Sequence, residues 1–159
     1  MAQLTKMESQ VDIKSSAEKF FQTFCNKQNE LPEMCPNVVK NMQLIKGDWQ
    51  SVGSIRKWIF VPGAGSSDQI EYCTVIVEAI DDKNKIVRNK AIEGEILMKL
   101  YNSYRFIIQA IDKADGSGSV VKTTIEYEKK NEAVPDPTAY LDFAAALYKT
   151  MDAHLINNA

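Results

Sequence analysis

Apolar residues recur at three- and four-residue spacing across residues 137–156. Such spacing places side chains on one face of a helix. The face is formed by Tyr140, Phe143, Ala144, Leu147, Met151 and Leu155. Asp136 followed by Pro137 is typical of a helix start, and neither glycine nor proline follows within the segment. The pattern predicts one helix, roughly 30 Å long, whose apolar face needs a partner, while Asp152 falls largely outside that face.

The chain before this helix consists mainly of strand-like segments. They are rich in valine, isoleucine, threonine and aromatic residues, and turn-forming residues separate them. The predicted strands cover residues 4–13, 38–46, 54–61, 69–80, 85–92, 98–112 and 119–130. After the first strand, Ser15 or Ser16 caps a short helix that ends at the polar stretch 26–29, and a second short helix covers residues 30–35.

The order of these elements predicts the fold class. Consecutive strands joined by short turns favour an antiparallel meander, and its apolar face must lie against the long helix. We therefore expect an α+β protein, with a seven-stranded antiparallel curved sheet wrapped around the long C-terminal helix, two short helices in a V, and one domain over residues 1–159. The apolar face of the long helix fits ordinary core packing or an internal cavity, and the pattern alone favours the core.

Composition and charge argue against several classes of partner. The chain of 159 residues has a net charge of −2, with 45% hydrophobic and 25% charged residues and no block of lysine and arginine. We therefore expect neither nucleic acid nor an anionic membrane surface as a partner. No stretch is long and apolar enough to span a membrane, and the first residues lack an apolar signal core, so a cytoplasmic location is expected.

Cysteine, histidine and glycine usage gives no candidate metal or nucleotide site. Cys25, Cys35 and Cys73 are odd in number and lack C-x-x-C spacing, which is typical of reduced thiols. His154 is the single histidine and lies far from any obvious nucleophile, so a Ser-His-Asp triad is not expected. The loop 47–53 does not continue into a P-loop pattern, because Ser-Ile-Arg follows its last glycine. We therefore expect no cofactor.

Three segments stand in a specific order along the chain. They are the loop Gly47-Asp48-Trp49 with Val52-Gly53-Ser54-Ile55-Arg56-Lys57, the break Glu93-Gly94-Glu95, and the strand with Val120-Val121-Lys122 and Glu126-Tyr127-Glu128-Lys129. Together with the element order, they resemble the plant major latex proteins, which belong to the birch-pollen-allergen and pathogenesis-related superfamily with its helix-grip (START-like) fold. The resemblance covers essentially the whole chain.

This resemblance implies a large internal cavity between the sheet and the long helix. Members of the family bind apolar or amphipathic small molecules there, including plant hormones, flavonoids, sterol-like compounds, fatty acids and alkaloid precursors. The resemblance therefore implies a hydrophobic small-molecule ligand and a role in plant defence or stress response. We expect a monomer, or at most a weak dimer.

The resemblance and the apolar pattern together predict which residues bind the ligand. Tyrosines, an arginine and a lysine would bring polar ends to an otherwise apolar wall, as a ligand cavity requires. The predicted ligand-binding residues are Phe24, Leu31, Arg56, Trp58, Phe60, Ile70, Tyr72, Tyr104, Phe106, Lys122, Tyr140, Phe143, Leu147 and Met151. The resemblance places Thr74 and Ile108 inward as well.

Lys122 separates a binding protein from an enzyme. Strand alternation would place Val121 and Tyr127 inward and Lys122 outward, whereas the resemblance places Lys122 inward, and we adopt the inward placement. In an alkaloid-forming enzyme that resembles this chain, a lysine in a similar strand is catalytic. The alternative function is therefore an isomerase or condensing enzyme that uses Lys122 and Tyr104, although Phe106 stands where such an enzyme needs an acid. A stress-related protein that acts through a protein partner is a third interpretation, and the surface charge gives it no support.

Overall fold

The helices and strands follow the predicted order closely. The computed structural model describes residues 4–61, 71–94 and 97–157. The strands are β1 (Thr5–Ile13), β2 (Val39–Lys46), β3 (Ile55–Phe60), β4 (Tyr72–Asp81), β5 (Ile86–Gly94), β6 (Tyr101–Asp112) and β7 (Ser119–Lys129). The helices are α1 (Ala17–Asn26), the 3₁₀ turn η1 (Gln28–Glu30), α2 (Leu31–Met34), α3 (Leu97–Leu100) and α4 (Thr138–Asn157).

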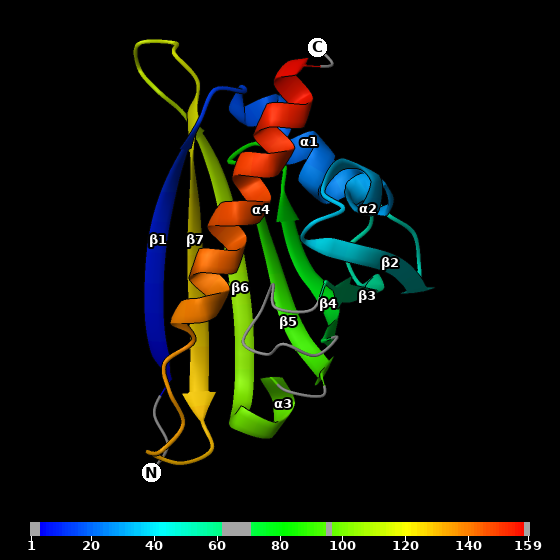
Figure 1. The fold of residues 1–159 in the computed structure, drawn as a ribbon, viewed down its shortest axis with the longest axis vertical. Coiled ribbons are helices and arrows are strands. Elements are labelled where there is room, and N and C mark those ends of the chain that lie inside the picture. Colours follow the sequence, from blue (N-terminus) through cyan, green and yellow to red (C-terminus); the bar gives the residue numbers. More distant parts are fainter. Residues whose placement is uncertain (1–3, 62–70, 95–96, 158–159) are drawn as a thin grey trace.

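The seven strands form one antiparallel sheet in the order β1-β7-β6-β5-β4-β3-β2. From β2 to β7, each strand pairs with the next along the chain, as a meander requires. β1 pairs with β7 instead, with Thr5 opposite Tyr127 and Ile13 opposite Ser119. The first two strands therefore form opposite edges of the sheet, and α1 and α2 lie between them along the chain (Figure 1). The predicted α+β class is confirmed.

The long helix α4 crosses the concave side of the sheet (Figure 1). It begins at Thr138, one residue after the predicted start at Pro137, and most of its apolar face is buried. The carboxylate of Asp136 accepts a hydrogen bond from the Tyr127 hydroxyl at 2.7 Å and pairs with Lys129 Nζ at 3.0 Å. Asp136 therefore attaches the segment before α4 to β7.

One acidic residue of α4 is buried, against the prediction from helical spacing. Asp152 is only 9% exposed. Its two carboxylate oxygens accept hydrogen bonds from the backbone N–H groups of Lys14 and Ser15, each at 2.9 Å. These groups lie just before α1, which Ser16 caps by accepting a hydrogen bond from the Lys19 N–H at 3.2 Å. The end of α4 is therefore bonded to the start of α1, a tertiary contact that helical spacing does not report.

Three phenylalanines hold α1 in place. Phe20, Phe21 and Phe24 are all buried. The ring of Phe20 meets the ring of Tyr148 on α4 edge to face, with centroids 5.3 Å apart, which is a favoured geometry for aromatic pairs. Helix α1 also contacts β6 and β7, so it covers one end of the space between α4 and the sheet.

Two strand predictions differ from the structure. Residues 98–112 were expected as one strand, but α3 takes residues 97–100 and β6 begins at Tyr101. Leucine, methionine and lysine favour helices, and the Tyr101 hydroxyl donates a hydrogen bond to the Pro135 carbonyl at 2.7 Å, which fixes the start of β6. The strand predicted over residues 69–80 begins at Tyr72 in the structure, and residues 69–70 lie outside the described ranges.

The described ranges contain neither a membrane-spanning helix nor a cluster of metal-binding side chains. No helix there is long and apolar enough to cross a membrane. The same residues contain no cluster of three or more histidine, cysteine, aspartate or glutamate side chains that could hold a metal ion. Cys25, Cys35 and Cys73 are all buried as free thiols.

Candidate ligand-binding cavity

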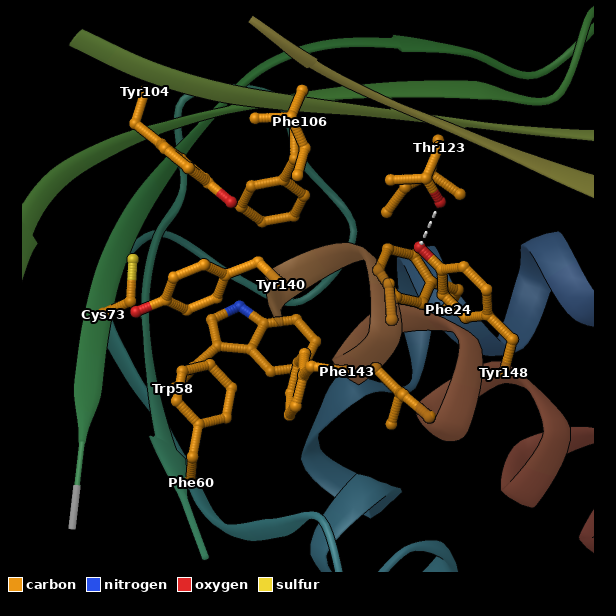
Figure 2. Close-up of a pocket in the computed structure, with 14 residues that line it drawn as sticks. Phe24, Trp58, Phe60, Cys73, Tyr104, Phe106, Thr123, Tyr140, Phe143 and Tyr148 are labelled. Atoms are coloured by element: carbon orange, nitrogen blue, oxygen red, sulfur yellow. Dashed lines mark hydrogen bonds between the residues drawn. The ribbon is translucent and has the colours of Figure 1, made fainter. Parts of the chain in front are cut away.

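An internal cavity of about 70 Å³ lies between α4 and the concave side of the sheet (Figure 2). Its wall is almost entirely apolar. The lining residues are Phe24, Trp58, Phe60, Cys73, Tyr104, Phe106, Ile108, Thr123, Ile125, Tyr140, Phe143, Ala144, Leu147 and Tyr148. They come from α1, β3, β4, β6, β7 and α4, so the cavity is formed by the assembled fold and by no single element.

Strand alternation and register build the sheet side of the cavity. Trp58 and Phe60 are two residues apart on β3 and therefore share a face. Cys73 on β4 pairs directly with Trp58, and residues paired across an antiparallel sheet also share a face. Phe106 on β6 and Ile125 on β7 are paired in the same way. The register therefore brings side chains from four strands to one surface.

Helix α4 supplies the opposite wall. Its lining residues are Tyr140, Phe143, Ala144, Leu147 and Tyr148. The ring of Phe143 meets the ring of Phe60 edge to face, with centroids 4.7 Å apart. Phe143 is only partly buried, whereas Phe60 is buried. The Phe60–Phe143 contact is therefore a part of the wall that reaches the surface between α4 and β3.

Two buried polar atoms near the cavity lack partners among the described residues, one on Trp58 in the cavity wall and one on Glu71, which bonds to the lining residue Tyr140 without lining the cavity itself. Trp58 is only 4% exposed, and its indole N–H meets no acceptor among the residues that the structure describes. Glu71, just before β4, is 1% exposed. One of its carboxylate oxygens accepts a hydrogen bond from the Tyr140 hydroxyl, and the other has no partner in the described part of the chain. An unsatisfied buried polar group costs about 1–3 kcal/mol, so the Trp58 end of the cavity has unused hydrogen-bonding capacity.

The Tyr104 hydroxyl points into the cavity near Phe106 (Figure 2). Its ring lies edge to face against Tyr140, with centroids 6.0 Å apart. Burial raises the pKa of Tyr104 well above the ordinary value of 10.0, and the nearby Cys73, Tyr140 and Glu71 raise it further. The hydroxyl therefore stays neutral at physiological pH and can donate or accept a hydrogen bond.

The opposite end of the cavity has satisfied polar groups. The hydroxyl oxygens of Thr123 and Tyr148 lie 3.0 Å apart, and the dashed line in Figure 2 marks their hydrogen bond. Burial raises the pKa of Tyr148 above its ordinary value, and the hydrogen bond with Thr123 lowers it by a smaller amount. The cavity is therefore asymmetric, because the Thr123–Tyr148 end is satisfied whereas the Trp58 N–H at the other end has no partner among the described residues.

The Cys73 thiol is a passive part of this wall. Burial raises the pKa of Cys73 to about 12, and the charge of Glu71 adds to the effect. Since the thiolate is the nucleophilic form of cysteine, the buried thiol behaves as an apolar lining group.

Most of the predicted ligand-binding residues do line the cavity. These are Phe24, Trp58, Phe60, Tyr104, Phe106, Tyr140, Phe143 and Leu147. Ile108, which the resemblance places inward, lines it as well. Contact between these residues and a ligand stays a prediction.

The predicted inward position of Lys122 is wrong. Its Nζ pairs with Glu8 Oε1 at 3.2 Å on the outer face of the sheet. The inward residues of this part of β7 are its neighbours Val121 and Thr123, which are buried. Strand alternation alone gives the correct face for Lys122. Its partners on the neighbouring strands, Gln10 of β1 and Gln109 of β6, share that outer face.

The predicted inward position of Tyr72 is also wrong. Because Cys73 pairs with Trp58 and faces the cavity, Tyr72 must face the other side. Lys57 Nζ lies 4.3 Å from the centroid of the Tyr72 ring on that outer face. The same register turns Thr74 away from the cavity. Ile70, predicted beside Tyr72, lies outside the described residues.

Arg56, Leu31 and Met151 are buried, but they are not part of the cavity wall where they were predicted. Leu31 and Met151 are fully enclosed in the core. Arg56 donates hydrogen bonds from Nη1 to the Cys25 carbonyl and from Nε to Ser54 Oγ, each at 3.1 Å. These bonds hold the guanidinium beside the loop 47–53, because Ser54 follows that loop directly.

Besides Ile108, five lining residues are absent from the predicted ligand-binding set: Cys73, Thr123, Ile125, Ala144 and Tyr148. Ala144 was predicted on the apolar face of the long helix, but not as a ligand-binding residue. Thr123 and Ile125 follow from the alternation that places Val121 inward, so that signal was available in the sequence. Cys73 depends on the register between β3 and β4, which the sequence does not specify. Tyr148 lies beside the predicted stripe of α4 and becomes inward-facing because Phe20 and Thr123 contact it.

Comparison with known proteins identifies relatives along nearly the whole chain. The profile of the pathogenesis-related protein Bet v 1 family matches residues 2–158. MLP-like protein 34 of Arabidopsis thaliana is 38% identical over 150 residues, which cover 94% of this chain and 46% of that protein. MLP-like protein 31 of the same plant is 34% identical over 152 residues, covering 96% of this chain and 86% of the relative. This chain thus spans about half the length of MLP-like protein 34 and most of the length of MLP-like protein 31.

Solved structures show the same architecture. Ginseng major latex-like protein 151 from Panax ginseng has a TM-score of 0.87 and 29% identity, covering 95% of this chain and 97% of that one. Norcoclaurine synthase from Thalictrum flavum, in complex with dopamine and hydroxybenzaldehyde, has a TM-score of 0.79 and 20% identity, covering 99% of this chain and 90% of that one. At that lower identity, the likeness to the synthase shows the fold alone.

Proposed function

Because the chain belongs to the pathogenesis-related protein Bet v 1 family, as its resemblance to major latex proteins predicts, we propose that it binds and carries apolar or amphipathic small molecules in the cavity under α4. The Bet v 1 fold is one that binds small ligands. Candidate ligands are plant hormones, sterol-like compounds, fatty acids, flavonoids and alkaloid precursors.

The observation that supports this proposal is the aromatic wall of the cavity. A hydrophobic core normally packs without voids larger than a water molecule, yet six elements of this fold surround a cavity of about 70 Å³. An apolar cavity with a few polar groups at one end is typical of a site for a small organic ligand. The Trp58 end of this cavity supplies those groups.

Entry of a ligand requires side chains to move. The cavity of about 70 Å³ is small, whereas ligand pockets typically enclose roughly 300–1,000 Å³. Among the lining residues, Phe106 and Phe143 are both partly exposed aromatics. Phe143 is the one at the contact between α4 and β3, where its ring meets the buried ring of Phe60 edge to face. We propose that the ligand passes between these two rings and that they close again behind it.

A displacement experiment tests ligand binding. The protein is titrated with N-phenyl-1-naphthylamine, a neutral apolar dye whose fluorescence rises in an apolar site. We expect saturable binding at micromolar concentration and displacement by plant metabolites of the proposed classes. Absence of saturable binding by the dye and by all of these compounds would refute the proposal.

A matched pair of variants locates the dye in the cavity. Ala144 lines the cavity, whereas Ala146 is exposed on the far side of the same helix. Ala144→Phe should fill the cavity and abolish dye binding, and Ala146→Phe should leave binding unchanged. If both variants bind the dye equally well, the dye occupies a different site.

The alternative function, a reaction catalysed by Lys122 and Tyr104, loses its geometric basis. Tyr104 faces the cavity, but Lys122 is on the opposite face of the sheet and pairs with Glu8. A general acid or base must reach the reacting group within hydrogen-bond distance. This arrangement therefore supports binding over a reaction that needs both residues.

We propose that the protein acts as a cytoplasmic monomer in defence or stress response. The three free thiols support a reducing compartment, because disulfides are rare there. Burial raises the pKa of Cys25 to about 12 and that of Cys35 to about 11, which keeps both thiols unreactive. The pathogenesis-related family supports the role in defence. Sedimentation analysis of the purified protein tests the monomeric state.

A further inference from the structure

The unsatisfied groups at the Trp58 end define which ligand chemistry the cavity can accept. In Figure 2, the indole nitrogen of Trp58 points toward the ring of Tyr140, and the ring of Tyr104 lies edge to face against that same ring. The Trp58 N–H can only donate a hydrogen bond, and the Tyr104 hydroxyl can donate or accept one. Among the described residues, neither a carboxylate nor a carbonyl oxygen accepts from the Trp58 N–H. A ligand atom that satisfies Trp58 must therefore be an acceptor.

The charged groups near the cavity determine whether an anionic or a neutral acceptor fits at this end. No lysine or arginine is among the described residues that line the cavity. The Glu71 carboxylate accepts a hydrogen bond from the hydroxyl of Tyr140, which is a residue of the cavity wall. A carboxylate ligand at this end would have no cationic partner and would meet a second carboxyl group across a low-dielectric interior. Anionic ligands are therefore disfavoured there.

A ligand cation is disfavoured for a different reason. An ammonium group has donors only and cannot satisfy the Trp58 N–H. Glu71 accepts a hydrogen bond from the lining residue Tyr140, but Glu71 itself does not line the cavity, and one of its oxygens is used in that bond. A charged amine would therefore be desolvated without direct contact with a carboxylate.

We infer that the cavity selects neutral ligands with a hydroxyl or carbonyl oxygen at one end of an apolar body, and that this oxygen accepts a hydrogen bond from Trp58 Nε1 and shares one with the Tyr104 hydroxyl. The inference rests on the proposed binding function and narrows its ligand class from amphipathic molecules in general to phenols, alcohols and ketones. The Trp58 N–H is inaccessible to solvent in the structure, so the ligand oxygen reaches it only when the side chains around it move.

Three probes of one shape test this selectivity. They are 2-naphthol, 2-methylnaphthalene and 2-naphthoate, which share a ring system and differ in the end group. Affinities are measured at pH 7 by displacement of N-phenyl-1-naphthylamine. The extra hydrogen bond should make 2-naphthol bind about three- to tenfold more tightly than 2-methylnaphthalene. The uncompensated charge should make 2-naphthoate bind more than about tenfold more weakly than 2-naphthol.

Variants of the donor groups separate polar recognition from shape. Trp58→Phe removes the N–H and keeps an aromatic ring, so the affinity for 2-naphthol should fall about three- to tenfold while the affinity for 2-methylnaphthalene changes little. Tyr104→Phe should reduce the same preference. Trp49→Phe is the matched control, because Trp49 packs on Arg56 outside the cavity and should change neither affinity.

Nuclear magnetic resonance gives a readout that does not need a folded variant of Trp58. The chain has two tryptophans, and the Trp49→Phe spectrum assigns their indole N–H signals. Addition of 2-naphthol should shift the Trp58 N–H signal as a hydrogen bond forms, and 2-methylnaphthalene should shift it much less. Equal shifts with both probes would overturn the inference.

The outcomes for the inference and for the proposed function are distinct. Equal affinities for 2-naphthol and 2-methylnaphthalene, or tighter binding of 2-naphthoate, overturn the inference and leave a hydrophobic binding protein. Failure of every probe and of the dye to bind overturns the proposed function as well.

Discussion

Tyr148 on α4 and Thr123 on β7 join their hydroxyl groups across 3.0 Å, inside a wall that is otherwise apolar. The two residues are buried and come from elements that meet only in the folded protein. Since an unpaired hydroxyl in such a place costs free energy, the pair also fixes the rotation of α4 over the sheet.

Thr123→Val should therefore destabilise the protein. Valine has the shape of threonine but leaves the Tyr148 hydroxyl unpaired, so the free energy of unfolding should fall by about 1–3 kcal/mol. Urea denaturation measures the change. Thr124→Val is the control, because Thr124 faces the other side of β7 and its hydroxyl bonds weakly, at 3.4 Å, to Glu8. Equal costs for the two variants would contradict a structural role for the Thr123–Tyr148 pair.

Leu147 and Met151 should respond differently to truncation. Both lie on the buried face of α4, but Leu147 borders the cavity and Met151 is enclosed by core atoms. Replacement by alanine in a packed core costs about 2–5 kcal/mol. Met151→Ala should fall in the upper part of this range and Leu147→Ala in the lower part, because contacts on the cavity side of Leu147 are already missing. Thermal and urea unfolding give both values, and a larger cost at Leu147 would argue for a solid core.

Asp152→Ala should weaken the attachment of the C-terminal part of α4 to the backbone just before α1. The substitution leaves the N–H groups of Lys14 and Ser15 without their acceptor, and hydrogen bonds to charged groups contribute about 1.5–3 kcal/mol each. Asp142→Ala, at an exposed position of the same helix, should stay within about 0.5 kcal/mol of the wild type. Hydrogen exchange of the Lys14 and Ser15 amides should quicken only in the Asp152 variant, and unchanged protection would rule out the proposed anchoring.

Lys122→Met should alter neither ligand affinity nor stability by much. The Lys122–Glu8 ion pair is on the surface, with both side chains partly exposed, and such pairs contribute about 0–1 kcal/mol. Dye titration and urea unfolding of the variant check both statements. A tenfold loss of affinity, or loss of a measurable turnover, would restore Lys122 to the site.

Buried tyrosines should make the fold sensitive to alkali. Burial raises the pKa of Tyr101 and Tyr127 to about 12, and the neighbouring Asp136 adds to both shifts. In the unfolded chain they ionise near the ordinary value of 10.0. Stability from these groups is therefore complete below pH 10.0 and is lost as the pH rises toward about 12. Urea unfolding across this interval, with tyrosinate absorbance recorded in parallel, should show stability and neutral tyrosine declining together. Tyrosines that ionise near pH 10.0 while the protein stays folded would contradict this account.

The sequence predicts the elements of this fold better than their faces. The long helix, the meander and Ser16 as a cap are all local features, set by spacing, turns and side-chain chemistry. At Lys122, the family resemblance gives the wrong face of the strand and alternation gives the right one. Successive residues of a strand point to opposite faces, so the face of one residue determines the face of the next. The α3 helix escaped prediction since a single turn produces no periodic signal.

The candidate site depends on contacts between distant residues, which the sequence does not report. The resemblance places Tyr72 inward, but the register of β4 against β3 pairs Cys73 with Trp58 and turns Tyr72 to the outer face. Glu71 falls within the predicted strand 69–80 as an ordinary acidic residue, and the sequence does not report the hydrogen bond that it accepts from the Tyr140 hydroxyl on α4. The same holds for Asp152, which becomes an internal group through the backbone of Lys14 and Ser15.

The pairing of β1 with β7 has a consequence for synthesis on the ribosome. Thr5 is synthesised early, but it can pair only after its partner Tyr127 has been synthesised. Strand β1 therefore joins the sheet as an edge strand only after the other six strands exist. Until then, charged residues of β1 such as Lys6 and Glu8 disfavour its pairing with a strand of another chain. Helix α4 follows β7, and the cavity has no wall on that side until α4 is complete. A ligand therefore cannot assist the early steps of folding, because its binding site is complete only after α4 has been synthesised.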